Sequence, residues 1–129
     1  IDTQPMDPIE GAELLTLDFL DDGAPETIMA SLGGPADAVL SDMAPRMTGH
    51  AKTDHLRIMA LAEAAFAFAT EVLAPGGVFV AKVLQGGTEK DLLTEMKTCF
   101  ATVRHAKPPA SRSDSSEIYV VAIGFRGAG

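Results

Sequence analysis

Three short apolar runs, separated by segments with helical periodicity, most strongly limit the folds open to this chain of 129 residues. They occupy residues 36–41, 78–84 and 118–123, are rich in β-branched residues, and are bounded by Gly, Pro or Ser. Such runs are typical of buried strands. Strands that alternate with helices predict an α/β fold, with a mainly parallel sheet and helices on both faces.

Start and stop signals predict the helices between these strands. Asp54 is a favourable N-cap for a long helix that ends near Leu73, and Thr88 caps a second helix that ends near Phe100. Pro75-Gly76-Gly77 is read as the turn between the first helix and the next strand. The other predicted elements are a strand at 13–17, a helix at 26–32 and a strand at 102–105. The length predicts one domain over residues 1–129.

The net charge of −8 opposes simple binding to nucleic acid, but the charge is unevenly distributed. Residues 1–81 hold 3 basic and 13 acidic residues, whereas residues 82–129 hold 7 and 5. Total charge therefore does not decide the partner, and a basic face in the second half stays open. Four basic residues either contact nucleic-acid phosphates or belong to a solvated surface: Lys107, Arg112, Arg104 and Arg126.

Composition argues against several classes of protein. Charged residues interrupt every apolar run that approaches the length of a membrane span. The single Cys99 excludes an internal disulfide, fits a reducing compartment and is predicted to be a core thiol. His50, Asp54 and His55 lie close in sequence, but no cysteine or third convergent ligand supports a metal site, so solvated histidines are favoured.

Each of the three apolar runs has an ionisable residue at one end. Asp42 follows the first run, Lys82 lies near the end of the second, and Glu117 precedes the third. A charge in such a position is costly unless it is paired or used. On neighbouring strands the three side chains would converge at one edge of the sheet. Their residue types alone fit a catalytic cluster and a salt bridge between strand ends equally well.

The glycine-rich turn that opens a doubly wound nucleotide-binding fold has no match in this chain. Its paired glycines are explained as helix stops and turns. Ile1-Asp2 reads as the end of a strand that has already begun. These observations predict that the chain is the C-terminal part of a longer protein, with the N-terminal strand and glycine-rich loop missing. A small fold without that loop is the alternative.

Several motifs resemble one family. SDMAPRMTG at 41–49, LAPGGVFVAKVLQG at 73–86 and SSEIYVVA at 115–122 closely resemble the FtsJ-type ribosomal RNA large-subunit 2′-O-ribose methyltransferases. The resemblance covers the whole chain. LxPGG alone occurs in many methyltransferases, whereas SDMAP, KVxQG and SSEIYVVA in this order are specific. The resemblance implies a Rossmann-like methyltransferase fold.

The resemblance also implies site residues. The family uses S-adenosylmethionine and a Lys–Asp–Lys–Glu tetrad, of which Asp42, Lys82 and Glu117 match the last three members. Asp2 is similar to the acidic residue that holds the cofactor ribose, and Asp18 to the one near the adenine, with Asp42 completing the predicted cofactor-binding set. From residue types alone, Asp2 and Asp18 are strand-end turn residues, and Asp42 makes an Asx turn before Pro45.

The first lysine of the tetrad and the glycine-rich loop would precede Ile1. Glycine-rich loops supply backbone contacts to such ligands. Residues 1–129 alone are therefore expected to bind the cofactor far more weakly than the whole protein, and the sequence leaves open whether they are active without the upstream segment.

The resemblance implies methyl transfer from S-adenosylmethionine to a ribose 2′-hydroxyl of large-subunit ribosomal RNA, in the cytoplasm, without a membrane or a metal. Lys82 is then the proton acceptor or the group that orients the hydroxyl. Neighbouring carboxylates raise its pKa, whereas burial and the cofactor's positive charge lower it, and the sequence leaves that balance open. The alternatives are a ribose methyltransferase for transfer RNA or an RNA cap, and an inactive RNA-binding or ribosome-assembly module.

Overall fold

The computed structural model describes residues 1–2, 4–43, 49–84, 89–107 and 117–127. It divides the chain into two compact units, Ile1–Gly34 and Pro35–Gly129, which are considered separately below. The single domain expected over residues 1–129 stays a prediction.

The first unit contains helix α1 (Ala24–Leu32), which extends the helix predicted at 26–32 by two residues at its start. The strand predicted at 13–17 is wrong as a regular strand, because only an isolated parallel bridge between Asp2 and Thr16 forms there. Pro5 and Pro8 follow Asp2 on the partner segment and have no N–H with which to continue a ladder.

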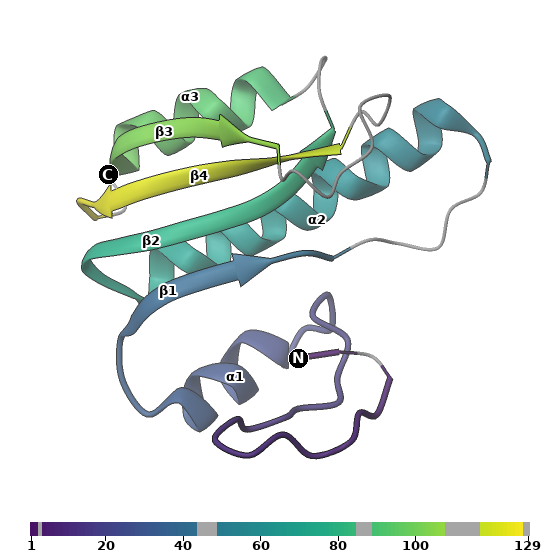
Figure 1. The fold of residues 1–129 in the computed structure, drawn as a ribbon, viewed down its shortest axis with the longest axis vertical. Coiled ribbons are helices and arrows are strands. Elements are labelled where there is room, and N and C mark those ends of the chain that lie inside the picture. The colour runs from purple at the N-terminus through teal and green to yellow at the C-terminus, as the bar shows by residue number, and fades with distance from the viewer. Residues whose placement is uncertain (3, 44–48, 85–88, 108–116, 128–129) are drawn as a thin grey trace. The chain divides into compact units, whose positions relative to one another are not determined.

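The second unit is built on a four-stranded sheet in the order β1-β2-β4-β3 (Figure 1). The strands are β1 (Ala36–Ser41), β2 (Leu73–Leu84), β3 (Phe100–Ala106) and β4 (Glu117–Phe125). β1 and β2 are parallel, whereas β4 is antiparallel to both β2 and β3. Thus β1, β2 and β3 point the same way, and β4 is reversed between two of them.

The α/β fold is confirmed, but the mainly parallel pairing is wrong for this described sheet, since only the β1–β2 pair is parallel. The segment between Ala106 and Glu117 explains the difference. A return to a parallel strand needs a crossover of about a dozen or more residues, usually a helix, and this segment is shorter. The chain therefore returns antiparallel and pairs between β2 and β3.

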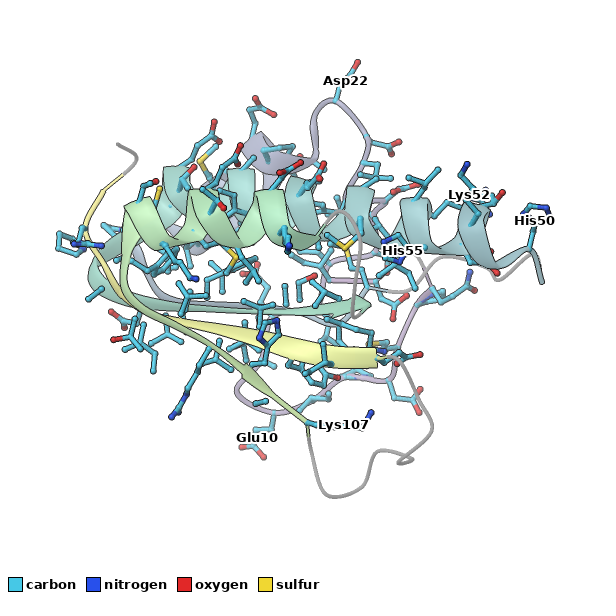
Figure 2. The ribbon with its side chains drawn as sticks, turned by 90° about the horizontal axis from the view of Figure 1, so that it is seen from above. Glu10, Asp22, His50, Lys52, His55 and Lys107 are labelled. Atoms are coloured by element: carbon cyan, nitrogen blue, oxygen red, sulfur yellow. The ribbon has the colours of Figure 1, made fainter. Side chains whose placement is uncertain are left out.

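Helices α2 (Ala51–Val72) and α3 (Glu89–Cys99) lie on the same side of the sheet (Figure 2). The described helices of this unit therefore cover one face, and the helices predicted on both faces of the whole sheet stay a prediction. The connections from β1 to β2 and from β2 to β3 advance across the sheet in one direction. Right-handed crossovers that advance in one direction place their helices on one face.

The core lies between this helical layer and the sheet. Phe79, Ala81 and Val83 of β2 are fully buried, and Cys99 is buried, as predicted. The ring of Phe79 lies 6.0 Å from that of Phe66 on α2 and 6.5 Å from that of Phe100 on β3, centre to centre. Because side chains alternate along a strand, burial of residues 79, 81 and 83 directs Lys82 to the opposite face.

The start of α2 differs from the prediction, because His50 rather than Asp54 is the N-cap residue. Asp54 lies in the first turn and is buried, and its Oδ2 accepts a hydrogen bond from the backbone N–H of Gly49 at 3.2 Å. A carboxylate there is favourable near the positive end of the helix dipole. The cap predicted at Thr88 lies outside the described residues.

The segment Pro75-Gly76-Gly77 lies within β2 instead of forming the predicted turn before it. The pairing with β1 jumps from Ala36↔Leu73 to Ala38↔Val78, so β2 bulges at this segment. A Cβ on Gly77 would lie 2.9 Å from the carbonyl oxygen of Ala74. The bulge therefore requires glycine at position 77, and beyond it the register that carries Lys82 is regular.

Candidate functional site

Asp42, Lys82 and Glu117 converge at one edge of the sheet, as the sequence predicts. Asp42 follows the last residue of β1, Lys82 lies two residues before the end of β2, and Glu117 begins β4. Glu117 reaches this edge because β4 is reversed, which pairs it with Leu84 at the end of β2. The three residues come from three neighbouring strands.

The lysine is held between the two carboxylates. Lys82 Nζ lies 2.8 Å from Asp42 Oδ1 and 3.3 Å from Glu117 Oε2. The side chain of Lys82 is only 16% exposed, whereas that of Asp42 is 66% exposed and that of Glu117 43%. Ion pairs with such open carboxylates contribute about 0–1 kcal/mol to stability. The exposed carboxylates are therefore accessible to a ligand. The ion pairs between the strands stabilise the fold only weakly.

Tyr119 is a fourth member of the cluster that the sequence reasoning missed. Its hydroxyl donates a hydrogen bond to Asp42 Oδ1 at 2.9 Å. Tyr119 pairs directly opposite Lys82 across the β2–β4 ladder, so the two side chains share one face. The two-residue alternation from Glu117 to Tyr119 was the signal that would have found it.

The electrostatics of the cluster favour charge on Lys82 and Asp42. The hydrogen bond to Asp42 raises the pKa of Lys82, burial opposes this, and the contact with Glu117 adds to the rise. Burial would raise the pKa of Asp42, but hydrogen bonds from Lys82 and Tyr119 together outweigh it and lower that pKa. The hydrogen bond to Asp42 also raises the pKa of Tyr119, so its hydroxyl stays protonated at neutral pH. In this chain without cofactor, the two carboxylates raise the pKa of Lys82 more than burial lowers it.

These pKa shifts predict a pH dependence of stability. The lowered pKa of Asp42 contributes stability above its ordinary value of 3.8 that is lost as the pH falls, and the raised pKa of Lys82 contributes stability that is lost as the pH rises beyond 10.5. The destabilisation by Lys82→Met is therefore expected to be largest near neutral pH, at about 1 kcal/mol or less, and to shrink at both extremes. Urea unfolding across that pH range measures it.

Lys97→Met on α3 is the matched control for this measurement, since Lys97 lies on a helix outside the cluster. Its effect on the free energy of unfolding should vary much less with pH. A destabilisation by Lys82→Met that stays constant from acid to alkaline pH would contradict the assigned ion pairs.

The two other predicted cofactor-binding residues, Asp2 and Asp18, belong to the first unit. Asp2 Oδ1 accepts the backbone N–H of Gln4 at 3.1 Å, and Asp18 Oδ1 accepts that of Leu20 at 3.0 Å. These are the Asx turns that residue types alone suggested. Both residues are exposed. An ionised carboxylate has several acceptor positions, so each can still accept a hydrogen bond from a ligand hydroxyl or amine, as binding a nucleoside requires.

The four basic residues for which the sequence left RNA contact and a solvated surface equally open have different surroundings. Arg126 Nη2 donates to the carbonyls of Lys97 at 2.9 Å and Phe100 at 2.7 Å, which gives it a structural role where α3 meets β3. Lys107 lies where β3 ends (Figure 2), and its Nζ donates a 3.4 Å hydrogen bond to the Glu117 carbonyl beside the cluster. Arg104 lies in β3, and Arg112 lies outside the described residues.

The described ranges were expected to hold neither a metal site nor a membrane span. They contain no group of three or more His, Cys, Asp or Glu side chains that could hold a metal ion. His50 lies at the start of α2 (Figure 2), where its Nδ1 is 3.4 Å from the hydroxyl of Thr53. Among the helices described, none is both long and apolar enough to cross a membrane.

One reversed strand lies in an otherwise co-directional sheet, and a lysine lies between two acids at the strand ends. Together with the structure compared next, this arrangement places the chain in the Rossmann-like methyltransferase class. The crystal structure of a ribosomal RNA methyltransferase from Plasmodium falciparum has this fold, with a TM-score of 0.84 and 26% identity over 98% of this chain and 70% of that one. The family model described as FtsJ-like methyltransferase matches residues 1–125. The chain belongs to the FtsJ-like methyltransferase family.

Relatives in two bacteria are more similar in sequence. A protein from Paramagnetospirillum magneticum is 65% identical over 122 residues, and one from Gluconobacter oxydans is 60% identical over 126 residues. Both are named ribosomal RNA large subunit methyltransferase E. The matches cover 95% and 98% of this chain but 50% and 47% of the relatives. The chain thus spans about half the length of these relatives.

Proposed function

We propose that the protein carrying this chain transfers a methyl group from S-adenosylmethionine to a ribose 2′-hydroxyl of large-subunit ribosomal RNA. The observation that carries the proposal is Lys82, held between Asp42 and Glu117 at the strand ends of a member of the FtsJ-like family. The names of the relatives support the substrate. Large-subunit RNA as the partner and the cytoplasm as the location are parts of the same proposal.

The proposed chemistry is an in-line displacement in which the ribose oxygen must be aligned with the methyl group. S-adenosylmethionine supplies that methyl group on a positively charged sulfonium. With its raised pKa, Lys82 is an ammonium at neutral pH, so it donates a hydrogen bond to the ribose oxygen and orients it. Asp42 and Glu117 hold the ammonium in place. The oxygen–methyl bond forms as the sulfur–methyl bond breaks, which leaves a neutral thioether. The hydroxyl proton passes to solvent, since Lys82 could accept it only after losing its own proton.

The proposed cofactor residues are Asp2, Asp18 and Asp42. The exposed carboxylates of Asp2 and Asp18 suit the ribose hydroxyls and the adenine amine, which are hydrogen-bond donors. Asp42 would lie where the cofactor meets Lys82. Calorimetric titration with S-adenosylmethionine measures the cofactor affinity of residues 1–129 and of the whole protein. The difference between the two affinities is the contribution of the residues outside this chain.

The function is tested by single-turnover methyl transfer with the whole protein. Radiolabelled S-adenosylmethionine is offered with large ribosomal subunits that lack ribose methylation, and nuclease digestion locates the labelled nucleoside. We expect one 2′-O-methylated ribose in large-subunit RNA and no label in subunits that are already methylated. Label in transfer RNA or capped RNA instead would support the related methyltransferases. Binding to ribosomal RNA without transfer would support an inactive module.

A further inference from the structure

Tyr119 and Lys82 bond to the same atom of the cluster. Asp42 Oδ1 lies 2.9 Å from the Tyr119 hydroxyl and 2.8 Å from Lys82 Nζ. The side chain of Asp42 is more exposed than those of Lys82 and Glu117, and Asp42 lies one residue beyond the end of β1. No strand pairing therefore fixes its backbone.

Tyr119 is the more rigid of the two donors to Asp42. It lies in β4, which pairs on one side with β2 and on the other with β3. Its half-buried ring has two side-chain torsions, whereas the lysine reaches Asp42 through a flexible four-carbon stem. A second, rigid donor on Oδ1 restricts rotation of the carboxylate more than the lysine alone can.

We propose that Tyr119 is a positioning residue, which orients the Asp42 carboxylate so that Asp42 in turn fixes the ammonium of Lys82 toward the reacting hydroxyl. This inference rests on the proposed function for its effect on methyl transfer. Its effect on Lys82 itself can be measured without any reaction.

Tyr119→Phe keeps the other charged side chains that lie near Lys82 in the described residues. Glu117 contacts the ammonium from β4, and Lys107 donates to the Glu117 carbonyl from the end of β3. Arg104 of β3 pairs with Val121, two residues beyond Tyr119 on the same face. Helices α2 and α3 lie on the opposite face. A change at Lys82 in Tyr119→Phe is therefore assigned to Asp42.

The first test is NMR titration of the Lys82 ammonium in the whole protein and in its Tyr119→Phe variant. If the hydroxyl orients Asp42, its loss weakens the Asp42–Lys82 bond. We then expect the pKa of Lys82 to fall toward its ordinary value of 10.5 and that of Asp42 to rise toward 3.8. A rise in the pKa of Lys82 would mean that Tyr119 competes with the lysine for Asp42, and an unchanged value would mean that it is a bystander. Either result overturns the proposal.

The second test is a double-mutant cycle. In an Asp42→Ala background, Tyr119→Phe should leave the pKa of Lys82 unchanged, because the residue through which Tyr119 acts is gone. A further change of similar size would refute action through Asp42. Ile123→Val, two pairs along the same face of β4, is the control for altered packing of that strand, and it should not move the pKa of Lys82.

The kinetic readout separates this inference from the proposed function. Tyr119→Phe should lower kcat about fivefold to tenfold with little change in KM, as loss of one positioning hydrogen bond predicts. If the parent protein transfers no methyl group, the proposed function fails while the titration still decides the role of Tyr119. If the parent is active and Tyr119→Phe retains full kcat, the positioning role fails alone.

Discussion

Lys82→Ala is expected to reduce methyl transfer by the whole protein by about a thousandfold or more, while its affinity for S-adenosylmethionine stays nearly unchanged. Lys82 lies between the two acids, so its removal takes away the group that we propose orients the ribose oxygen. Its loss therefore appears in the chemical step. Single-turnover transfer to unmethylated subunits measures the rate, and calorimetric titration measures cofactor affinity.

Lys82→Arg refines this result. Guanidinium keeps the charge but is planar, does not fit a point-charge site and cannot accept a proton at neutral pH, so the variant should also be nearly inactive. Near-parental rates with Arg would leave electrostatic positioning as the only role. Lys90→Ala, an exposed lysine at the start of α3, is the matched control and should keep the parental rate. Near-parental rates with Lys82→Ala would show that the cluster is only a salt bridge between strand ends, without a role in methyl transfer.

The largest expected effect on stability belongs to Phe79. Its side chain is fully buried, with the rings of Phe66 and Phe100 on either side. Phe79→Ala removes these contacts and leaves a cavity, which should lower the free energy of unfolding by about 3–5 kcal/mol. Since the free energy of unfolding of a whole domain is about 5–15 kcal/mol, this single change removes a large fraction of it. Urea unfolding followed by circular dichroism measures the change.

Two variants test whether this effect comes from the core. Phe79→Leu fills part of the cavity and should cost clearly less than Phe79→Ala. Ile123→Ala changes the opposite, partly exposed face of the sheet, where Ile123 is 37% exposed, and should also cost less. A loss below about 1 kcal/mol in Phe79→Ala would show that the three rings do not form the core.

The strands were more predictable than the way they pair. β1 agrees with the predicted 36–41 residue for residue, because a short run with apolar residues, bounded by Gly-Pro and by Asp42, has few other interpretations. Pairing direction depends on the connection between strands, not on the residues within them. The alternation of buried residues along β4 is the same for parallel and antiparallel pairing, so the sequence pattern does not define the pairing direction or the face that the helices cover.

The site was predictable where a charge interrupted an apolar pattern. Asp42, Lys82 and Glu117 stand out for that reason, although the catalytic role proposed for them was indicated by the resemblance. Tyr119 was missed because tyrosine is common in strands, so its residue type carried no signal, and only its two-residue spacing from Glu117 pointed to the site. Nor did the sequence decide the pKa of Lys82, because the 2.8 Å contact with Asp42 that outweighs burial depends on the register of three strands.

The reversal of β4 also has a consequence for the order of events in folding. Asp42 and Tyr119 are separated by 77 positions, and they meet only after β4 has paired with β2. Such non-local pairing is slow, because the chain loses the entropy of loop closure before the stabilising contacts between the strands form. A slip of one residue between β2 and β4 would turn Tyr119 and Glu117 to the helical face and bring Val120 to the site. The complete set of lysine contacts therefore exists only in chains whose sheet has finished folding in the correct register.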